Sequence, residues 1–107
     1  MEIVWSPLAL ERVESIARHI AEDKPGAAIE WVDGLFASVE RLAGFPESGR
    51  VVPEVGARRI REVMFGAYRV IYSVGAQVDV LTVRRSNQLL RLSELSDTEA
   101  APVGRGL

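Results

Sequence analysis

The sequence predicts an α+β fold in which an N-terminal strand and a helical hairpin pack on one face of a small antiparallel sheet, in the order β-α-α-β-β-β. Two observations predict this class. Apolar residues recur every three or four positions through most of the first half, as in amphipathic helices, and from residue 57 they alternate with polar residues, as in strands. A loop containing Gly49, Pro53 and Gly56 separates the two halves. At 107 residues the chain has room for one domain with one modest core.

The first strand is expected at residues 2–5, where Ser6 and Pro7 end it. Ser6 is a favourable N-cap because its hydroxyl can accept a hydrogen bond from a free backbone N–H, and Pro7 is tolerated at the first helical position. A helix is therefore expected to begin at Pro7. Its apolar stripe consists of Leu10, Val13, Ile16, Ala17 and Ile20.

A second helix is expected after the break at residues 23–26. Its apolar stripe consists of Ala28, Val32, Leu35, Val39 and Leu42, widened by Trp31 and Phe36. Gly44 suits the left-handed position that often follows a helix, Phe45 can pack back on the last turn, and Pro46 prevents continuation. The two helices are thus expected to form an antiparallel hairpin.

Three strands are expected between residues 57 and 85 as an antiparallel meander, with Gly66 and Gly75 in its turns. The core face of the middle strand consists of Tyr68, Val70, Tyr72 and Val74. Its opposite face consists of Arg69, Ile71 and Ser73. Because a helical hairpin covers only one face of a sheet, we expect the second face to be open. The domain is expected to span residues 1–92, with residues 93–107 as a flexible tail.

The composition is that of a folded domain, with 48% hydrophobic and 26% charged residues. No apolar run approaches the roughly 18 residues that a membrane-spanning helix needs, and the start of the chain lacks the basic and then apolar layout of a signal peptide. We therefore expect a cytoplasmic protein. The chain has no cysteine, which excludes disulfides and thiolate metal ligands. We expect neither a metal nor a cofactor.

The net charge of −2 conceals an uneven distribution along the chain. Residues 1–49 carry nine acidic and four basic side chains, and residues 92–107 carry three acidic and one basic. By contrast, residues 50–91 carry three acidic and eight basic side chains. This asymmetry predicts an electropositive surface that attracts an anionic partner.

The arginines of the predicted sheet are the candidate functional residues. For Arg58, Arg59 and Arg61, a binding role and a protective role at the sheet edge are equally good interpretations. Arg69 lies in the middle strand, where a guanidinium is costly unless it pairs or faces a groove. We favour a binding role for Arg69 over an ion pair with Glu62 or Asp79.

Two further features bear on the candidate site. Arg84 and Arg85 end the last strand, so one of them must point to the second face in either register. The only histidine, His19, is expected on the exposed side of the first helix. We interpret it as an ordinary surface residue.

The order of these elements resembles a family of small bacterial toxins. Strand 68–74, the turn at residues 75–77, strand 78–83, then Arg84-Arg85-Ser86 and Leu89-Leu90 are similar to the sheet of the RelE/ParE toxin superfamily of type II toxin-antitoxin systems. The resemblance covers roughly residues 2–92. It implies a toxin that a cognate antitoxin protein holds inactive, of the kind associated with plasmid stabilization and growth inhibition.

The superfamily contains two functional kinds. RelE-like members cut messenger RNA on the ribosome with basic residues and a C-terminal tyrosine or histidine, whereas ParE-like members poison DNA gyrase. Residues 86–90 contain neither tyrosine nor histidine, and arginine is a poor proton-transfer group. We therefore favour a ParE-like toxin without enzymatic activity. The alternatives are a RelE-like endoribonuclease, with Arg69, Arg84 and Arg85 as its catalytic residues and the ribosome and messenger RNA as its partners, and a non-toxic module that only binds antitoxin.

The resemblance also assigns candidate binding residues. The segment after the last strand takes part in poisoning the target in ParE-like relatives. The target-binding residues expected here are Arg69, Arg84, Arg85, Leu89, Leu90 and Arg91. The antitoxin-binding residues expected here are Arg58, Arg59, Arg61, Arg69 and Ile71.

Overall fold

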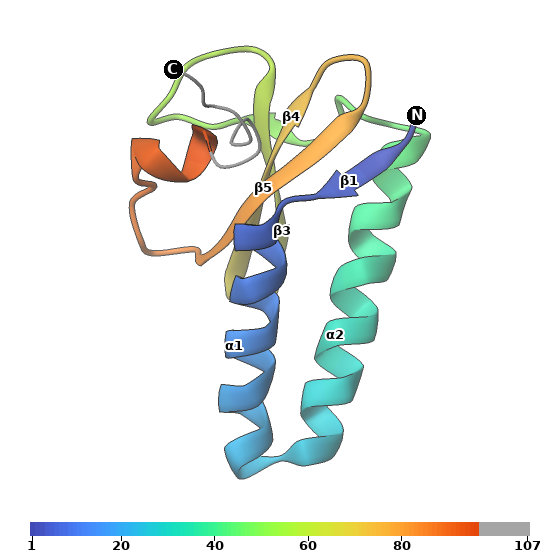
Figure 1. Ribbon diagram of the computed structural model, residues 1–107, viewed down its shortest axis with the longest axis vertical. Coiled ribbons are helices and arrows are strands. Elements are labelled where there is room, and N and C mark those ends of the chain that lie inside the picture. The colour runs from blue at the N-terminus through green and yellow to red at the C-terminus, as the bar shows by residue number, and fades with distance from the viewer. Residues whose placement is uncertain (97–107) are drawn as a thin grey trace.

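The computed structural model describes residues 1–96 and shows an α+β fold, as the sequence predicts (Figure 1). The strands are β1 (Ile3–Trp5), β2 (Arg50–Val51), β3 (Ile60–Phe65), β4 (Tyr68–Val74) and β5 (Val78–Arg85). The helices are α1 (Pro7–Asp23), α2 (Pro25–Glu40) and the 3-10 helices η1 (Arg41–Ala43) and η2 (Leu92–Ser96). The predicted domain boundary after residue 92 therefore falls inside η2, and residues 97–107 of the predicted tail lie outside the described part.

The five strands form one sheet in the order β1-β5-β4-β3-β2. The meander of β3, β4 and β5 is antiparallel, as expected, and β1 joins its edge parallel to β5. A β-bulge at Leu81 shifts the register, because Ile71 pairs with Thr82 but Tyr72 pairs with Val80. The bulge resets the alternation, so that Val80 and Val83 both pack in the core under the helices.

The helical hairpin forms for the reasons that the sequence indicates. The Ser6 hydroxyl accepts a hydrogen bond from the backbone N–H of Ala9 at 2.9 Å, and Pro7 and Pro25 each occupy a first helical turn. The hairpin packs along one face of the sheet and its tip extends beyond the sheet (Figure 1). Within residues 1–96 no helix has the length and apolar character needed to cross a membrane.

The end of α2 differs from the expectation. Gly44 has φ −95° and ψ −22°, so it is not left-handed, and the Phe45 side chain is 70% exposed instead of packing back on the helix. The chain tightens into η1, where the backbone N–H groups of Gly44 and Phe45 both donate to the carbonyl of Arg41. This 3-10 turn satisfies the carbonyl of Arg41 without a left-handed residue.

The sheet has an apolar cluster on each face. The larger one lies under the helices, and its fully buried members are Ala9, Val13, Leu35, Val39, Leu42, Val70, Tyr72, Val78, Val80 and Val83. The smaller one lies on the other face and consists of Val52, Ile60, Ile71 and Leu81, with Val55, Ala57, Leu90 and Leu95 packed against it. The predicted assignment of Val70 and Tyr72 to the helix side and of Ile71 to the opposite side is correct.

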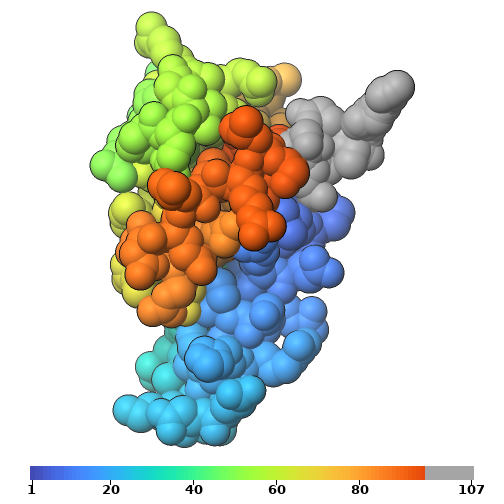
Figure 2. Space-filling view, turned by 90° about the vertical axis from the view of Figure 1, so that its left-hand side faces the viewer, coloured from blue at the N-terminus to red at the C-terminus, as the bar shows by residue number. Residues whose placement is uncertain are grey.

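The expectation that the second face is open is wrong. The loop before β3 and the segment that follows β5 cover it, and Figure 2 shows this segment in orange between the green loop and the blue α1. The alternating pattern identified the apolar residues of this face but not their cover. The cover forms because Ile71 and Leu81 on this face would otherwise expose apolar surface to water.

Candidate functional site

Arg69 is the centre of a buried ion-pair network on the second face of the sheet. Its Nε donates to Glu62 Oε1 at 2.7 Å, and its two terminal nitrogens donate to the carboxylate oxygens of Glu54 at 2.8 and 2.9 Å. One terminal nitrogen also donates to the backbone carbonyl of Gln88 at 3.0 Å. The other oxygen of Glu62 accepts from Nε of Arg50. Arg69 therefore joins β3, the loop before it and the segment after β5.

The pKa shifts in this network have the signs expected of strong charge pairing. The hydrogen bonds from Arg69 hold the pKa of Glu54 at about 2, well below its ordinary value of 4.5. The hydrogen bond to Glu54, with further contributions from Glu62, raises the pKa of Arg69 above its ordinary value. Both groups are thus charged at neutral pH.

These contacts place Arg69, which was predicted to bind a partner, in a buried ion-pair network. The residue is only 4% exposed and each of its nitrogens is engaged, so it cannot contact a target or an antitoxin in this conformation. The ion pair with Glu62, which was the alternative interpretation, is present. Asp79 is not a partner, since it accepts from the side chain of Gln77. Ile71, predicted to bind antitoxin, is also fully buried.

The segment of residues 86–96, here called the C-terminal strap, is held by hydrogen bonds and ion pairs to the sheet and to the loop before β3. Glu54 accepts from the backbone N–H of Leu90 at 3.2 Å. Glu94 is 4% exposed and accepts from Thr82 at 2.8 Å and from Arg84 at 2.8 Å. Arg12 of α1 adds an ion pair with Glu94 at 3.4 Å.

The strap largely covers Arg84, one of the residues predicted to bind the target. Arg84 does point to the second face, as one of the pair had to, but its side chain is 13% exposed and pairs with Glu94. Burial alone would raise the pKa of Glu94, yet hydrogen bonds from Thr82, Arg84 and the Arg91 N–H, together with the charge of Arg12, lower it. Arg84 is therefore a structural partner of an ionised carboxylate.

Other predicted target-binding residues remain accessible. Arg85 is exposed, with its guanidinium 5.5 Å from the centroid of the Tyr68 ring. The side chain of Leu89 is 78% exposed, and Arg91 is exposed too. Leu90, in contrast, packs on the second apolar cluster. The strap therefore alternates between side chains that fasten it and side chains that face solvent.

The predicted antitoxin-binding arginines divide in the same way. Arg58 and Arg59 are exposed, and within residues 1–96 neither side chain has a hydrogen bond or an ion pair. Arg61 is half-buried and donates to the backbone carbonyl of Gly49 at 2.9 Å. Arg61 thus holds the loop after η1, and only Arg58 and Arg59 are free to orient a partner.

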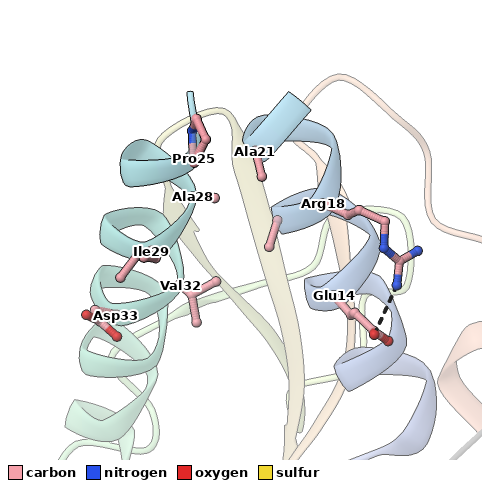
Figure 3. Close-up of a pocket in the computed structure, with 9 residues that line it drawn as sticks. Glu14, Arg18, Ala21, Pro25, Ala28, Ile29, Val32 and Asp33 are labelled. Atoms are coloured by element: carbon pink, nitrogen blue, oxygen red, sulfur yellow. Dashed lines mark ion pairs between the residues drawn. The ribbon is translucent and has the colours of Figure 1, made fainter. Parts of the chain in front are cut away.

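An apolar groove runs between the two helices at the tip of the hairpin (Figure 3). It has a volume of about 450 Å³, and its floor and one side consist of Ala17, Ala21, Pro25, Ala28, Ile29 and Val32. Ile29 is 66% exposed, and the Glu14–Arg18 ion pair and Asp33 lie at the rim. The groove stays open for two reasons. Its lining includes small side chains, and the sheet does not extend to this end of the hairpin.

Sequence reasoning missed the carboxylates that close the second face. Glu54 lies in an exposed-looking loop, and Glu94 lies in a segment without periodicity. Glu62 was recognisable as a possible partner, because residue 62 faces Ile71 across the ladder and so lies diagonally next to Arg69. No local sequence pattern indicates that Glu54 and Glu94 pair with the sheet arginines.

Comparison with known proteins agrees with this architecture. The family model of the ParE toxin of the type II toxin-antitoxin system parDE matches residues 3–90, which include every strand and both long helices. The chain belongs to the ParE toxin family. It is therefore a ParE-type toxin of a type II toxin-antitoxin system.

Two relatives place the chain within this family. The Sinorhizobium fredii protein named "Putative toxin Y4kP" is 32% identical over 88 residues, which are 80% of this chain and 88% of that protein. A solved chain of the chromosomal ParDE TA system from P. aeruginosa has a TM-score of 0.69 and 19% identity, and the likeness covers 79% of this chain and 95% of that one. The second likeness shows the shared fold. The family match ends inside the strap, before Glu94.

Proposed function

We propose that this ParE-type toxin arrests growth by poisoning DNA gyrase and that a cognate antitoxin neutralises it. The observation that carries the choice of target is the closed second face of the sheet. RelE-like nucleases resemble this chain in their strand arginine, but here Arg69 is sealed in ion pairs with Glu54 and Glu62. A group held in this way is not available to a scissile phosphate.

The strap gives a second reason to favour gyrase over ribosomal messenger RNA. RNA cleavage needs groups that can exchange a proton, and residues 86–90 supply none. Tyr72 does not replace them, because it is fully buried, donates to the carbonyl of Pro46 at 2.8 Å, and has a pKa that burial raises. The proposal therefore assigns the toxin a binding function.

The surface proposed to contact gyrase is the solvent-facing side of the strap. Leu89 and Arg91 project from it, and Leu92 is 72% exposed. Arg85, the last residue of β5, is exposed just before the strap begins and completes this surface. Apolar and cationic side chains that alternate on an ordered segment form a plausible anchor set, since arginine is enriched in interface hot spots. This surface replaces the predicted set, from which Arg69, Arg84 and Leu90 are removed.

The antitoxin is proposed to bind in the apolar groove of the hairpin. An amphipathic segment that folds on binding can insert apolar side chains between α1 and α2 beside Ile29. Arg58 and Arg59 lie elsewhere on the molecule and can attract acidic residues of the same partner. The apolar contacts supply most of the affinity in this proposal and the arginines set orientation.

Expression of the chain in a bacterial host that carries a DNA-damage reporter tests the target. Growth arrest with reporter induction, reversed by co-expression of the antitoxin, is the expected result. Arrest with immediate loss of translation and codon-dependent cuts in ribosome-bound messenger RNA would establish the nuclease instead. Normal growth with tight antitoxin binding would establish the non-toxic module.

A further inference from the structure

A cavity with several polar side chains in its lining lies between α1 and the C-terminal end of β5. Its volume is about 380 Å³. β1 pairs with β5 only from Val78 to Val80, so in the described part of the chain the rest of this β5 edge faces α1 instead of another strand. The lining residues that can donate hydrogen bonds are Arg12, Ser15, His19, Tyr68, Arg84, Arg85 and Gln88.

The lining brings together residues that are far apart in the sequence. His19 is exposed, as predicted, but it shares this cavity with Arg85 and Tyr68 of the sheet. Ile16 and Val83 give the cavity an apolar floor. His19 is thus close to the sheet arginines in space although it is far from them in the sequence.

The cavity carries an excess of positive charge. Glu94 neutralises one charge but contacts two arginines, Arg12 and Arg84. Arg85 forms no ion pair with a carboxylate anywhere in residues 1–96. Glu22 lies 3.6 Å from His19. Three arginines and one buried carboxylate leave about two uncompensated positive charges beside the cavity.

Tyr68 and Gln88, two neutral residues of the lining, have hydrogen-bond donors left over. The Tyr68 hydroxyl accepts from Arg85 at 3.2 Å, which leaves its own proton free. The side-chain carbonyl of Gln88 accepts from Arg84 at 3.3 Å and from the Arg85 N–H at 3.4 Å, which leaves the amide N–H groups free. The cavity thus presents donors with few acceptors, which suits a ligand with several anionic oxygens.

We propose that this cavity binds a phosphate ester of the kind carried by a nucleotide or a nucleic acid strand. A phosphate offers more acceptor oxygens than a carboxylate and so matches the number of donors here. The guanidinium of Arg85, 5.5 Å from the centroid of the Tyr68 ring and bonded to its hydroxyl, provides a cationic group in the lining of the cavity. The inference goes beyond gyrase poisoning, because it concerns the toxin's own ligand and its test needs no gyrase.

Fluorescence anisotropy with the purified full chain and a labelled 12-nucleotide single strand tests the proposal, with adenosine monophosphate and inorganic phosphate as competitors. Arg85→Ala is expected to weaken binding about 10-fold and to lower the salt dependence by about one phosphate contact. Tyr68→Phe, which removes only the hydroxyl, is expected to weaken binding about 3-fold. Competition by the mononucleotide would identify a free nucleotide as ligand, and binding that requires strand length would identify a nucleic acid.

Arg58→Ala is the matched control. Arg58 is an exposed arginine whose side chain has no partner in the described residues. It precedes Arg59, whose carbonyl accepts from Val74 at the end of β4 opposite Arg85, and these two ends of the strand are about 20 Å apart. Its substitution is expected to change binding less than 2-fold. Equal weakening by Arg58→Ala and Arg85→Ala would show attraction by net charge alone and overturn the proposal. Displacement of the strand by hexaglutamate as effectively as by phosphate would assign the cavity to an acidic peptide and also overturn it.

Discussion

At the scale of single residues, the same side-chain type has opposite roles in this toxin. Arg69 is buried, Arg84 is partly buried, and both pair with carboxylates, whereas Arg58 and Arg85 are exposed. A buried guanidinium loses its hydration, so it is tolerated only where carboxylates replace the water. Burial and pairing, not residue type, decide which arginines can meet a partner.

Arg69→Ala is expected to lower the free energy of unfolding by about 3 kcal/mol, because it leaves Glu54 and Glu62 close together without their shared cation. Urea denaturation measures the change. Arg58→Ala, with an exposed and unpaired side chain, should alter stability by no more than about 0.5 kcal/mol. If Arg69→Ala left stability unchanged but abolished growth arrest, a binding role would be restored.

Glu54 is expected to make the free energy of unfolding depend on pH in the acid range. Its pKa is lowered from 4.5 to about 2, so the carboxylate stabilises the folded state above pH 4.5 and this contribution is lost as the pH falls toward 2. Glu54→Gln should therefore be less stable than the wild type at pH 7, with a difference that disappears near pH 2. Thermal unfolding of both proteins across this range measures the difference. A gap that stayed constant with pH would show that the charge is not responsible.

At the scale of elements, the strap is both a cover and a presenting surface. Leu90 and Leu95 pack on the second cluster while Leu89 and Leu92 face solvent. Removal of the strap after Ser86 would uncover Ile71 and Leu81 and leave Arg84 without Glu94. We therefore expect such a truncated chain to be strongly destabilised, so truncation cannot separate binding from folding.

Two neighbouring leucines make that separation possible. Leu90→Ala should lower the free energy of unfolding by about 2 kcal/mol because it opens a cavity beside the second cluster. Leu89→Ala should change stability by less than about 0.5 kcal/mol and should weaken growth arrest. Unfolding curves and growth assays on the two variants check this pattern. Full toxicity of Leu89→Ala combined with Arg91→Ala would remove the strap from target binding.

At the scale of the whole molecule, the toxin has separate surfaces for its proposed partners. The apolar groove lies at the tip of the hairpin, which extends beyond the sheet, and the solvent-facing strap lies on the face opposite the helices (Figures 1 and 2). Such separation allows an antitoxin to bind without directly covering the strap. Neutralisation can then depend on further contacts of the antitoxin, for which Arg58 and Arg59 are available.

The toxin–antitoxin complex is expected to survive about 1 M salt, where the Debye length is roughly 3 Å, because apolar contacts in the groove carry most of its affinity. Ile29→Asp should weaken the complex at least about 10-fold, since it removes buried apolar area and adds a charge. Leu10→Asp, at an exposed α1 residue outside the groove, is the matched control. Titration calorimetry at low and high salt measures both, and complete dissociation by salt would refute the apolar groove as the main contact.

The sequence by itself determined the two long helices, β1, β3, β4 and β5 and their order, but not β2, which lies in the expected loop, or the 3-10 helices η1 and η2. The Ser6 cap, the break at residues 23–26 and the meander from β3 to β5 all follow from short-range rules of capping, turn chemistry and periodicity. The side of the sheet that each β4 residue faces was also predictable, because alternation in a strand is local. The ParE-like character was recognisable from the same elements.

Only the tertiary structure decided which surfaces are available. Arg69 meets Glu54 and Gln88 at separations of 15 and 19 residues, and no periodic pattern reports contacts of that range. The bulge at Leu81, the strap and the proximity of His19 to Arg85 are likewise set by how the elements pack. A buried arginine is tolerated only with its partners in place, and those partners come from segments that have no regular structure of their own.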